Sequence, residues 1–264
     1  MSEYQHYQFL AIDRPLGRVE QEKVRAYSTR ARITATVFEN EYHWGDFKGD
    51  PVKFLREWYD VFVYTANWGA HRLGLGLPAT AVDLELARRC CGKHVGLSES
   101  KGRLVVDMEA HLEESPDYDE SETGMGELTG VRAAVLRGDE RIWYICWLLG
   151  VQEGQVKDKE EEPIVPTGLE ELSGELGALV EFLYVDQNLV KAAAKGTGGV
   201  AKVSAADMRQ WIEGLANAEK NELLIRAAKG DISAELARRL GQGRKGAATC
   251  DPRTAGDLRM DAGM

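Results

Sequence analysis

Strand and helix signals alternate through the first 112 residues, and this order restricts the chain to folds that pack helices on a sheet. The strand signals share an alternation of apolar or β-branched residues with polar ones, and they cover Tyr7–Ile12, Arg32–Phe38, Ala70–Leu77, His94–Leu97 and Arg103–Met108. The helix signals share apolar positions three and four residues apart, and they cover Arg18–Tyr27, Asp50–Ala66 and Val82–Cys91. Repeated β-α-β steps indicate one sheet covered by helices.

The helix signal that begins at Asp50 combines a start signal with a periodic apolar pattern. Asp50 can accept a backbone hydrogen bond at the N-cap, and Pro51 loses no hydrogen bond at the first helical position. Apolar side chains then recur at helical spacing up to Ala66. We therefore expect an α+β fold that begins with a mixed sheet and packed helices, ferredoxin-like or related.

The remainder of the chain has mainly helical signals. They cover Glu127–Leu136, Arg141–Leu149, a leucine series from Leu169 to Leu183 behind the capping box Thr167–Glu170, Asp186–Lys195, Ser204–Leu215, Asn217–Lys229 and Asp231–Leu240. The segment Ile142–Leu149 is strongly apolar and must be buried. Trp143 and Trp147 need large apolar partners, so this region is expected to pack against the sheet.

Charge is distributed unevenly and suggests where the chain divides. The net charge is −10, and residues 113–185 hold 18 acidic side chains but only 5 basic ones. Residues 113–127 are acidic and rich in turn-forming residues, which is typical of a linker. We predict an α/β-type domain at 1–112, the acidic linker at 113–127, a helical region at 128–240 and a flexible tail at 241–264.

Several classes of protein are disfavoured by these features. The longest strongly apolar stretch is far shorter than the roughly 20 residues of a membrane span, and the N-terminal residues do not resemble a signal peptide. A cytoplasmic location without membrane attachment is expected. The chain has no Cys-x-x-Cys, and the neighbours Cys90, Cys91 and His94 fit buried thiols better than a metal site. No metal or cofactor is predicted.

The best candidate for a functional site is a group of ionisable and aromatic residues around a loop between a strand and a helix. Its members are Tyr42, His43, Trp44, Asp46, Asn67, Trp68, His71 and Arg72. A histidine there could act as a general base oriented by Asp46, with Arg72 binding an anion. In the alternative interpretation Asp46 caps a turn, Arg72 pairs with a carboxylate, and an aromatic core is formed by Trp44, Phe47, Trp58 and Trp68. No residue is assigned as catalytic.

Some of these residues also occur in two distinctive segments. The segments are Tyr7-x-Phe9-x-Ala11-Ile12-Asp13-Arg14-Pro15-Leu16 and Asn40-Glu41-Tyr42-x-Trp44-Gly45-Asp46-Phe47-Lys48-Gly49-Asp50-Pro51, and Ala66-Asn67-Trp68-Gly69 follows them. On these residues the chain resembles a family of bacterial proteins that has no established activity. The resemblance covers roughly residues 4–240 and implies no catalytic or binding residues. Family members often continue into a charged helical region, and Arg253–Leu258 resembles its start.

Three functions are compatible with these observations. The first is a non-catalytic protein-interaction or regulatory module, which the acidic connector segments, the leucine-rich helix and the uneven charge favour over an enzyme. The second is a small-ligand binder or enzyme that uses Tyr42, His43, Asp46 and Arg72. The third and weakest is a nucleic-acid-associated protein with contacts through Arg238, Arg239, Arg244 and Lys245, which the net negative charge disfavours. We expect a protein partner.

Overall fold

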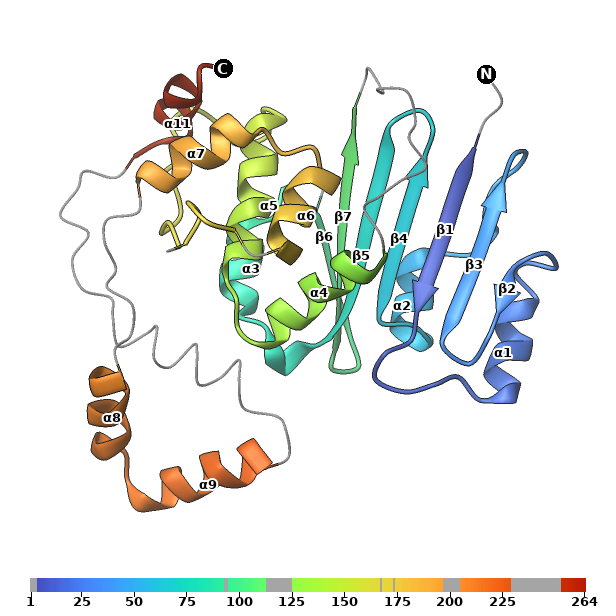
Figure 1. Cartoon of the computed structure of the whole chain (residues 1–264), viewed down its shortest axis with the longest axis horizontal. Coiled ribbons are helices and arrows are strands. Elements are labelled where there is room, and N and C mark those ends of the chain that lie inside the picture. The colour runs from blue at the N-terminus through green and yellow to red at the C-terminus, as the bar shows by residue number, and fades with distance from the viewer. Residues whose placement is uncertain are drawn as a thin grey trace.

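A seven-stranded sheet runs through the first half of the chain in the computed structural model (Figure 1). The structure describes residues 4–92, 95–112, 125–166, 168–172, 174–196, 205–228 and 253–264. The strands are β1 (Gln5–Leu10), β2 (Arg32–Ile33), β3 (Val37–Tyr42), β4 (Val61–Ala66), β5 (Ala70–Pro78), β6 (Val95–Ser100) and β7 (Arg103–His111). Their order across the sheet is β2-β3-β1-β4-β5-β7-β6.

The helices divide between the sheet region and the second half of the chain. Within the sheet region lie α1 (Arg18–Arg25), α2 (Pro51–Glu57), a short 3₁₀ helix at Ala79–Ala81 and α3 (Leu84–Cys90). The later helices are α4 (Met125–Leu136), α5 (Arg141–Gln152), α6 (Gly174–Phe182), α7 (Gln187–Lys195), α8 (Ala205–Gly214), α9 (Asn217–Ala228) and α11 (Ala255–Ala262). The predicted α+β class, with a sheet first and a helical region after it, is confirmed.

The pairing of the strands differs from the mixed sheet that we expected. Every pair of neighbouring strands among the described residues is antiparallel. The alternating order of strands and helices led us to expect a mixed sheet, but antiparallel strands can be joined by short turns as well as by helices. The hairpins β4–β5 and β6–β7 are closed by such turns.

Two predicted elements are divided in the structure. The helix expected from Asp50 to Ala66 ends at Glu57, and its second part is strand β4. The apolar spacing across this segment is compatible with a helix, but Val61–Ala66 is rich in β-branched and aromatic residues that favour a strand. The strand expected at Arg32–Phe38 is likewise two elements, β2 and β3, which pair with each other.

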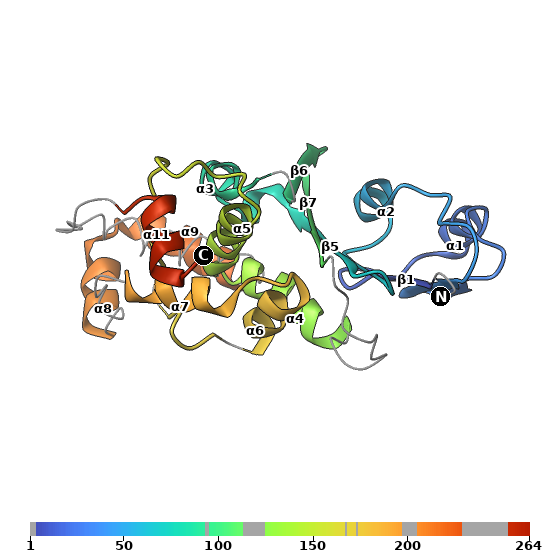
Figure 2. The ribbon, with the colours of Figure 1, turned by 90° about the horizontal axis from the view of Figure 1, so that it is seen from above.

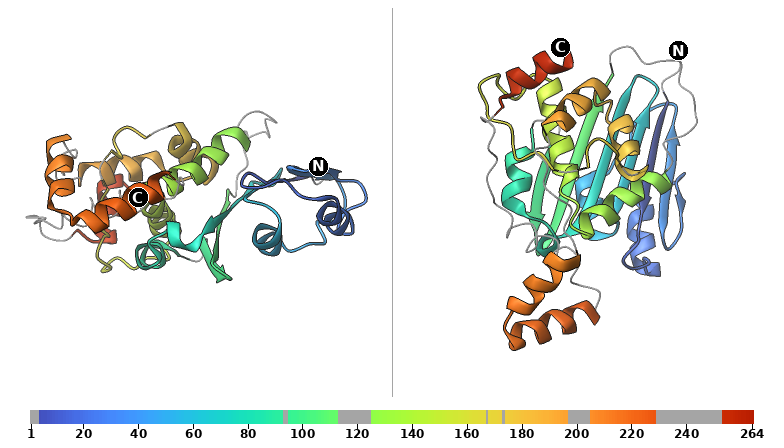
Figure 3. Two further views of the ribbon diagram at one scale, coloured as in Figure 1. Left: turned by 90° about the horizontal axis from the view of Figure 1, so that it is seen from below. Right: turned by 60° about the vertical axis from the view of Figure 1, so that its left-hand side comes forward.

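Different helices cover the two faces of the sheet. Helices α1 and α2 lie on one face, and α4 to α7 lie on the other, as the view from above shows (Figure 2). We call these the α1–α2 face and the α4–α7 face. The α1–α2 face has an aromatic core that includes Phe9, Phe38, Phe54 and Phe62. Two further views show the helical layer against the opposite side of the sheet (Figure 3).

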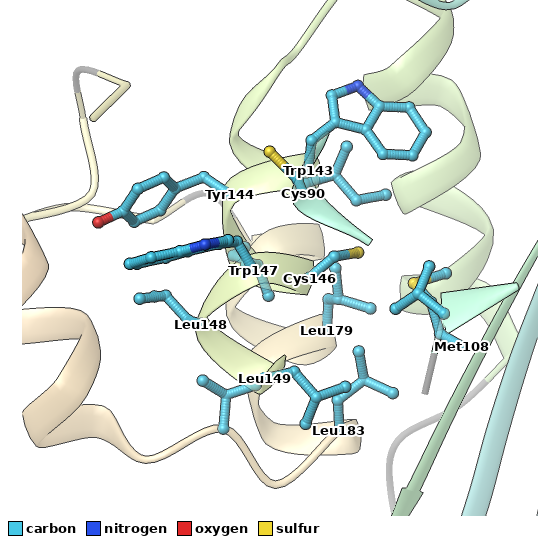
Figure 4. Close-up of a cluster of buried hydrophobic side chains, with 14 of the residues drawn as sticks. Cys90, Met108, Trp143, Tyr144, Cys146, Trp147, Leu148, Leu149, Leu179 and Leu183 are labelled. Atoms are coloured by element: carbon cyan, nitrogen blue, oxygen red, sulfur yellow. The ribbon is translucent and has the colours of Figure 1, made fainter. Parts of the chain in front are cut away.

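The core on the α4–α7 face joins the sheet to the helical region. Helix α5 is buried along almost its whole length, and the ring of Trp147 lies beside that of Tyr144 on the same helix (Figure 4). Leu176 and Leu179 of α6 are part of this core. Met108 of β7 belongs to the same core. The leucine series is only partly helical, because α6 begins at Gly174, after Leu169 and Leu172. Thr167, the first residue of the expected capping box, lies outside the described residues.

A buried network of charges connects the two layers at one end of the sheet. The carboxylate of Asp60 accepts hydrogen bonds from the backbone N–H groups of Ile12 (2.6 Å) and Asp13 (2.9 Å). Arg103 of β7 donates to Asp60 (2.6 Å), and Arg132 of α4 donates to Asp13 (2.7 Å). Asp60 and Arg132 are almost fully buried. Burial of charge is costly unless it is paired, and here each charge has an opposite partner.

The ends of the predicted regions also differ from expectation. Residues 113–124 of the acidic linker lie outside the described residues, and Met125 to Glu127 already belong to α4. The last residues, expected within a flexible tail, include helix α11, which contacts α7 and α5. Arg253 precedes this helix and donates two hydrogen bonds to Glu162 (2.8 and 2.7 Å). Among the described residues, each helix is too short or too polar to cross a bilayer.

Candidate functional site

The predicted site residues divide between the two faces of the sheet. Tyr42 and Arg72 point to the α1–α2 face, because their registers pair them with Gln5 and Tyr64 on that face. His71 points to the α4–α7 face, since successive side chains of a strand alternate. The sequence placed His71 and Arg72 in one site, and the structure separates them across the sheet.

A row of polar and aromatic residues crosses the α1–α2 face, and Arg72 is part of it. The strand registers place Asn40, Tyr7, Tyr64, Arg72 and Glu109 side by side on β3, β1, β4, β5 and β7. The rings of the two tyrosines lie 4.6 Å apart. We call these five residues the tyrosine row. Sequence analysis found only Arg72 among them.

The loop after β3 is tied to this row by Asp46. The hydroxyl of Tyr7 donates to Oδ1 of Asp46 at 2.6 Å, and the backbone N–H of Phe47 donates to the same oxygen at 2.7 Å. The side-chain amide of Gln5 donates to the carbonyl oxygen of Gly45 at 3.1 Å. Burial, together with the hydrogen bond to Asp46, raises the pKa of Tyr7 well above its usual range. Asp46 thus holds the loop in place. This role is similar to the alternative interpretation in which Asp46 caps a turn.

Arg72 is engaged in an ion pair within the sheet. Its Nε and Nη2 atoms donate to the two carboxylate oxygens of Asp107 at 2.7 and 2.6 Å. Its guanidinium carbon lies 5.8 Å from the centre of the Phe62 ring. The hydrogen bonds to Asp107 raise the pKa of Arg72. This two-pronged pair matches the alternative in which Arg72 meets a carboxylate.

The predicted aromatic residues divide between a core and one end of the sheet: Phe47 is buried in the aromatic core and Trp58 packs against it, whereas Trp44 and Trp68 lie at the end of the sheet. His43 and Trp44 follow β3, and Trp68 lies in the turn between β4 and β5. Tyr4 lies between them: its ring is 5.4 Å from that of His43, and its backbone N–H donates to the side chain of Asn67 at 3.0 Å. Trp44 is 82% exposed and Trp68 is 39% exposed. We call Tyr4, His43, Trp44 and Trp68 the aromatic end.

His71 links the sheet to the helical layer. Its Nδ1 lies 2.8 Å from the carbonyl oxygen of Phe182 and its Nε2 lies 2.9 Å from the hydroxyl of Tyr184. A carbonyl accepts, so Nδ1 carries the proton and the Tyr184 hydroxyl donates to Nε2. The aromatic rings of Phe182 and Tyr184 both stack on the imidazole of His71, and the centroid of each lies 4.6 Å from that of the imidazole. Burial lowers the pKa of His71, which keeps the ring neutral.

Comparisons with protein-family models, with curated proteins and with solved structures found no match. The family resemblance therefore stays a prediction. The structure gives parts of its two segments local roles, since Asp13 holds Arg132 and Asp46 holds Tyr7. Asp50 accepts from the backbone N–H of Val52 at 2.9 Å and caps α2, as its position before Pro51 indicated.

Three cysteines of the described residues, Cys90, Cys91 and Cys146, lie in or against the core on the α4–α7 face. Burial raises the pKa of Cys90 and of Cys91 to about 12, so both thiols are protonated and poorly reactive at neutral pH. Cys146 is fully buried on α5. His94 lies outside the described residues, as do Arg238 to Lys245. In the part of the chain that the structure describes, no three side chains of His, Cys, Asp or Glu are grouped to hold a metal ion.

Several residues of the arrangement were missed in the sequence analysis. Tyr7 and Gln5 donate hydrogen bonds to the loop after β3, and Asp107 accepts hydrogen bonds from Arg72. The alternation of Gln5, Tyr7 and Phe9 along β1 would have placed these three side chains on one face. No pattern within the chain could have paired Arg72 with Asp107, which lies 35 residues further on.

Proposed function

We propose that the chain is a non-catalytic protein-interaction module whose contact surface is the aromatic end. The observation that carries the proposal is the 82% exposure of Trp44 on a loop that is held in place from below. Exposed apolar side chains that lie together are typical of interaction surfaces, and Trp44 and Trp68 are both exposed at the same end of the sheet. Tryptophan and tyrosine are also the residues that contribute most to protein–protein binding.

The loop geometry supports a preformed surface. Tyr7 and Gln5 fix Asp46 and Gly45, directly beside Trp44. A loop that is already ordered loses little conformational entropy when it binds, and this favours affinity. Phe47 of the same loop is buried in the aromatic core, which anchors its other side.

The ligand-binding alternative is placed second because its charged groups have internal partners. Arg72 uses two donors on Asp107, and Asp46 accepts from Tyr7 and from the backbone. His43 approaches Tyr4 and Trp44, and within the described residues no hydrogen bond joins it to Asp46. The nucleic-acid alternative rests on residues outside the described ranges.

A cytoplasmic location is part of the proposal. Its support is that Cys90, Cys91 and Cys146 are free thiols, as is usual in a reducing compartment. In that compartment a partner protein would cover the exposed rings of Trp44 and Trp68.

The test compares the proteins captured from the native host by the tagged chain and by Trp44→Ala. Loss of one exposed hot-spot ring should weaken a complex by about 2 kcal/mol or more, enough to remove a stoichiometric partner from the capture. Ile164→Ala is the matched control, because Ile164 is also apolar and 76% exposed but lies in the connector before α6. Identical captures by all three proteins would exclude the aromatic end as the contact surface.

A further inference from the structure

The two edge strands of the sheet differ in length. On one side the sheet ends in β2, which has two residues. On the other side it ends in β6, which has six residues and, within the described part of the chain, pairs with β7 alone. A long edge strand offers its outer N–H and C=O groups to another strand, unless charge, proline or a bulge prevents it. The β6 strand contains no proline and pairs with β7 without interruption.

The register shows which groups of β6 are free. Lys101 and Gly102 both have positive φ (52° and 76°), as in a two-residue type I′ turn that makes Ser100 and Arg103 a hydrogen-bonded pair. Alternation then points the N–H and C=O groups of Leu97 and Glu99 away from β7. Val95 follows the same rule, since its N–H donates to Gly92 instead of to β7. Within the described residues, nothing pairs with the outer groups of Leu97 and Glu99.

Basic side chains approach this edge from both faces of the sheet. Arg56 of α2 contacts the hydroxyl of Ser98 on the α1–α2 face. Arg88 of α3 lies 3.8 Å from the carboxylate of Glu99 on the other face. Lys101 is exposed in the turn that ends the strand. Three cations thus surround a strand with one carboxylate, in a chain whose net charge is −10.

The side chains of β6 leave room beside Arg56. Gly96 and Ser98 are small and share the α1–α2 face, whereas the partly buried Leu97 faces the opposite core. An added strand would therefore meet the cation of Arg56 on one face, and on the other the apolar side chain of Leu97 next to the Arg88–Glu99 ion pair. Acidic residues would suit the first face and apolar residues the second.

We propose that β6 is a docking edge for an extended peptide that alternates acidic and apolar residues and adds an eighth strand to the sheet. The outer groups of Leu97 and Glu99 supply the main-chain hydrogen bonds, and Arg56 selects for acidic residues. This mode of recognition combines backbone pairing for affinity with alternate side chains for specificity. The surface is separate from the aromatic end and does not depend on the function proposed for it.

Binding of a synthetic peptide to the full chain tests this assignment. The probe is a fluorescein-labelled octapeptide of alternating valine and glutamate, followed by fluorescence anisotropy, and a second peptide has lysine in place of glutamate. The acidic peptide should bind saturably and about tenfold more tightly than the basic one, and Arg56→Ala should remove most of that preference. Arg30→Ala, an exposed arginine on the other half of the molecule, should leave it unchanged.

Leu97→Pro removes an outward N–H that the fold does not use, so it should weaken binding about tenfold. Leu97→Thr retains the N–H and should bind within about twofold of the parent chain. Equal binding of all variants, or equal binding of the two peptides, would overturn the assignment.

Amide hydrogen exchange decides the matter if the proline variant does not fold. In the free chain the amides of Leu97 and Glu99 should exchange fast while that of Ser98 is protected, and the acidic peptide should slow the first two. Protection of Leu97 and Glu99 without peptide would mean that a second copy or another segment already covers β6, and the proposal would fail.

Discussion

At the scale of single residues, the same pattern of charged side chains can serve a site or hold a fold. Arg72 was a candidate anion ligand, but its guanidinium is matched to Asp107 in a forked ion pair. His43, its neighbour in the prediction, is exposed beside Trp44. Arg72 should therefore contribute more to the stability of the fold than His43 does.

Arg72→Ala should lower the free energy of unfolding by about 1–3 kcal/mol, because it leaves the largely buried Asp107 without its partner. His43→Ala should change it by less than about 0.5 kcal/mol, as is usual for exposed positions. Urea denaturation of the two variants measures both. A loss at His43 equal to that at Arg72 would show that the aromatic end is part of the structural core.

At the scale of elements, the turn between α6 and α7 is held to β5 by one imidazole. Tyr184 has a positive φ of 53°, which is uncommon outside glycine, and its ring and hydroxyl both contact His71. The neutral tautomer satisfies both partners of the ring at once. Protonation would place a second N–H against the Tyr184 hydroxyl, which must then rotate to accept.

Stability should therefore depend on pH through His71. Its pKa is lowered in the folded chain relative to about 6.5 in the unfolded chain, so the unfolded state binds the proton more readily. The contribution of His71 is complete above about pH 6.5 and is lost as the pH falls through the folded-state pKa. Urea midpoints at several pH values between 7.5 and 5 measure this loss.

His71→Phe is the matched variant, because it retains an aromatic ring but cannot titrate. It should be less stable at pH 7.5 and should show a smaller fall toward pH 5, because every other group is the same in both proteins. Parallel curves for the parent chain and the variant would rule out His71 as the source of the pH dependence.

At the scale of the whole molecule, one sheet serves two layers and a charge network joins them. Asp60 meets Arg103, which also donates to two carbonyl groups beside α2, and Arg132 of α4 lies 3.7 Å from the same carboxylate. Burial alone would raise the pKa of Asp60, but hydrogen bonds from Arg103 and from the backbone lower it further than burial raises it. The carboxylate is therefore charged in the folded chain.

Asp60→Asn should destabilise the chain by about 3 kcal/mol or more, because it leaves buried arginines without their central anion. The control is Asp158→Asn, which removes an exposed carboxylate that also pairs with an arginine, Arg259, and should cost less than about 1 kcal/mol. Denaturant midpoints provide the comparison. Similar losses in the two variants would contradict the central role of Asp60.

How much of this could be read from the sequence depends on the distance between the interacting residues. Local patterns were sufficient for the α+β class, for the presence of strands at β6 and β7 and for the cap at Asp50. They were insufficient at Phe62 and Ala66, whose spacing fits a helix although the residues lie in a strand. Contacts such as Tyr7 with Asp46 or Arg132 with Asp13 join distant segments, and one sequence contains no signal for such pairs.

The position of β1 in the sheet has a consequence for the order in which the fold can assemble. The hairpins β4–β5 and β6–β7 close over short turns, so they lose little chain entropy when they form. Strand β1 precedes β3 and β4 in the chain and pairs with one of them on each side, across much longer loops. Both edges of β1 can therefore be paired only after residue 66 has been synthesised, and this pairing costs more chain entropy than closing either hairpin.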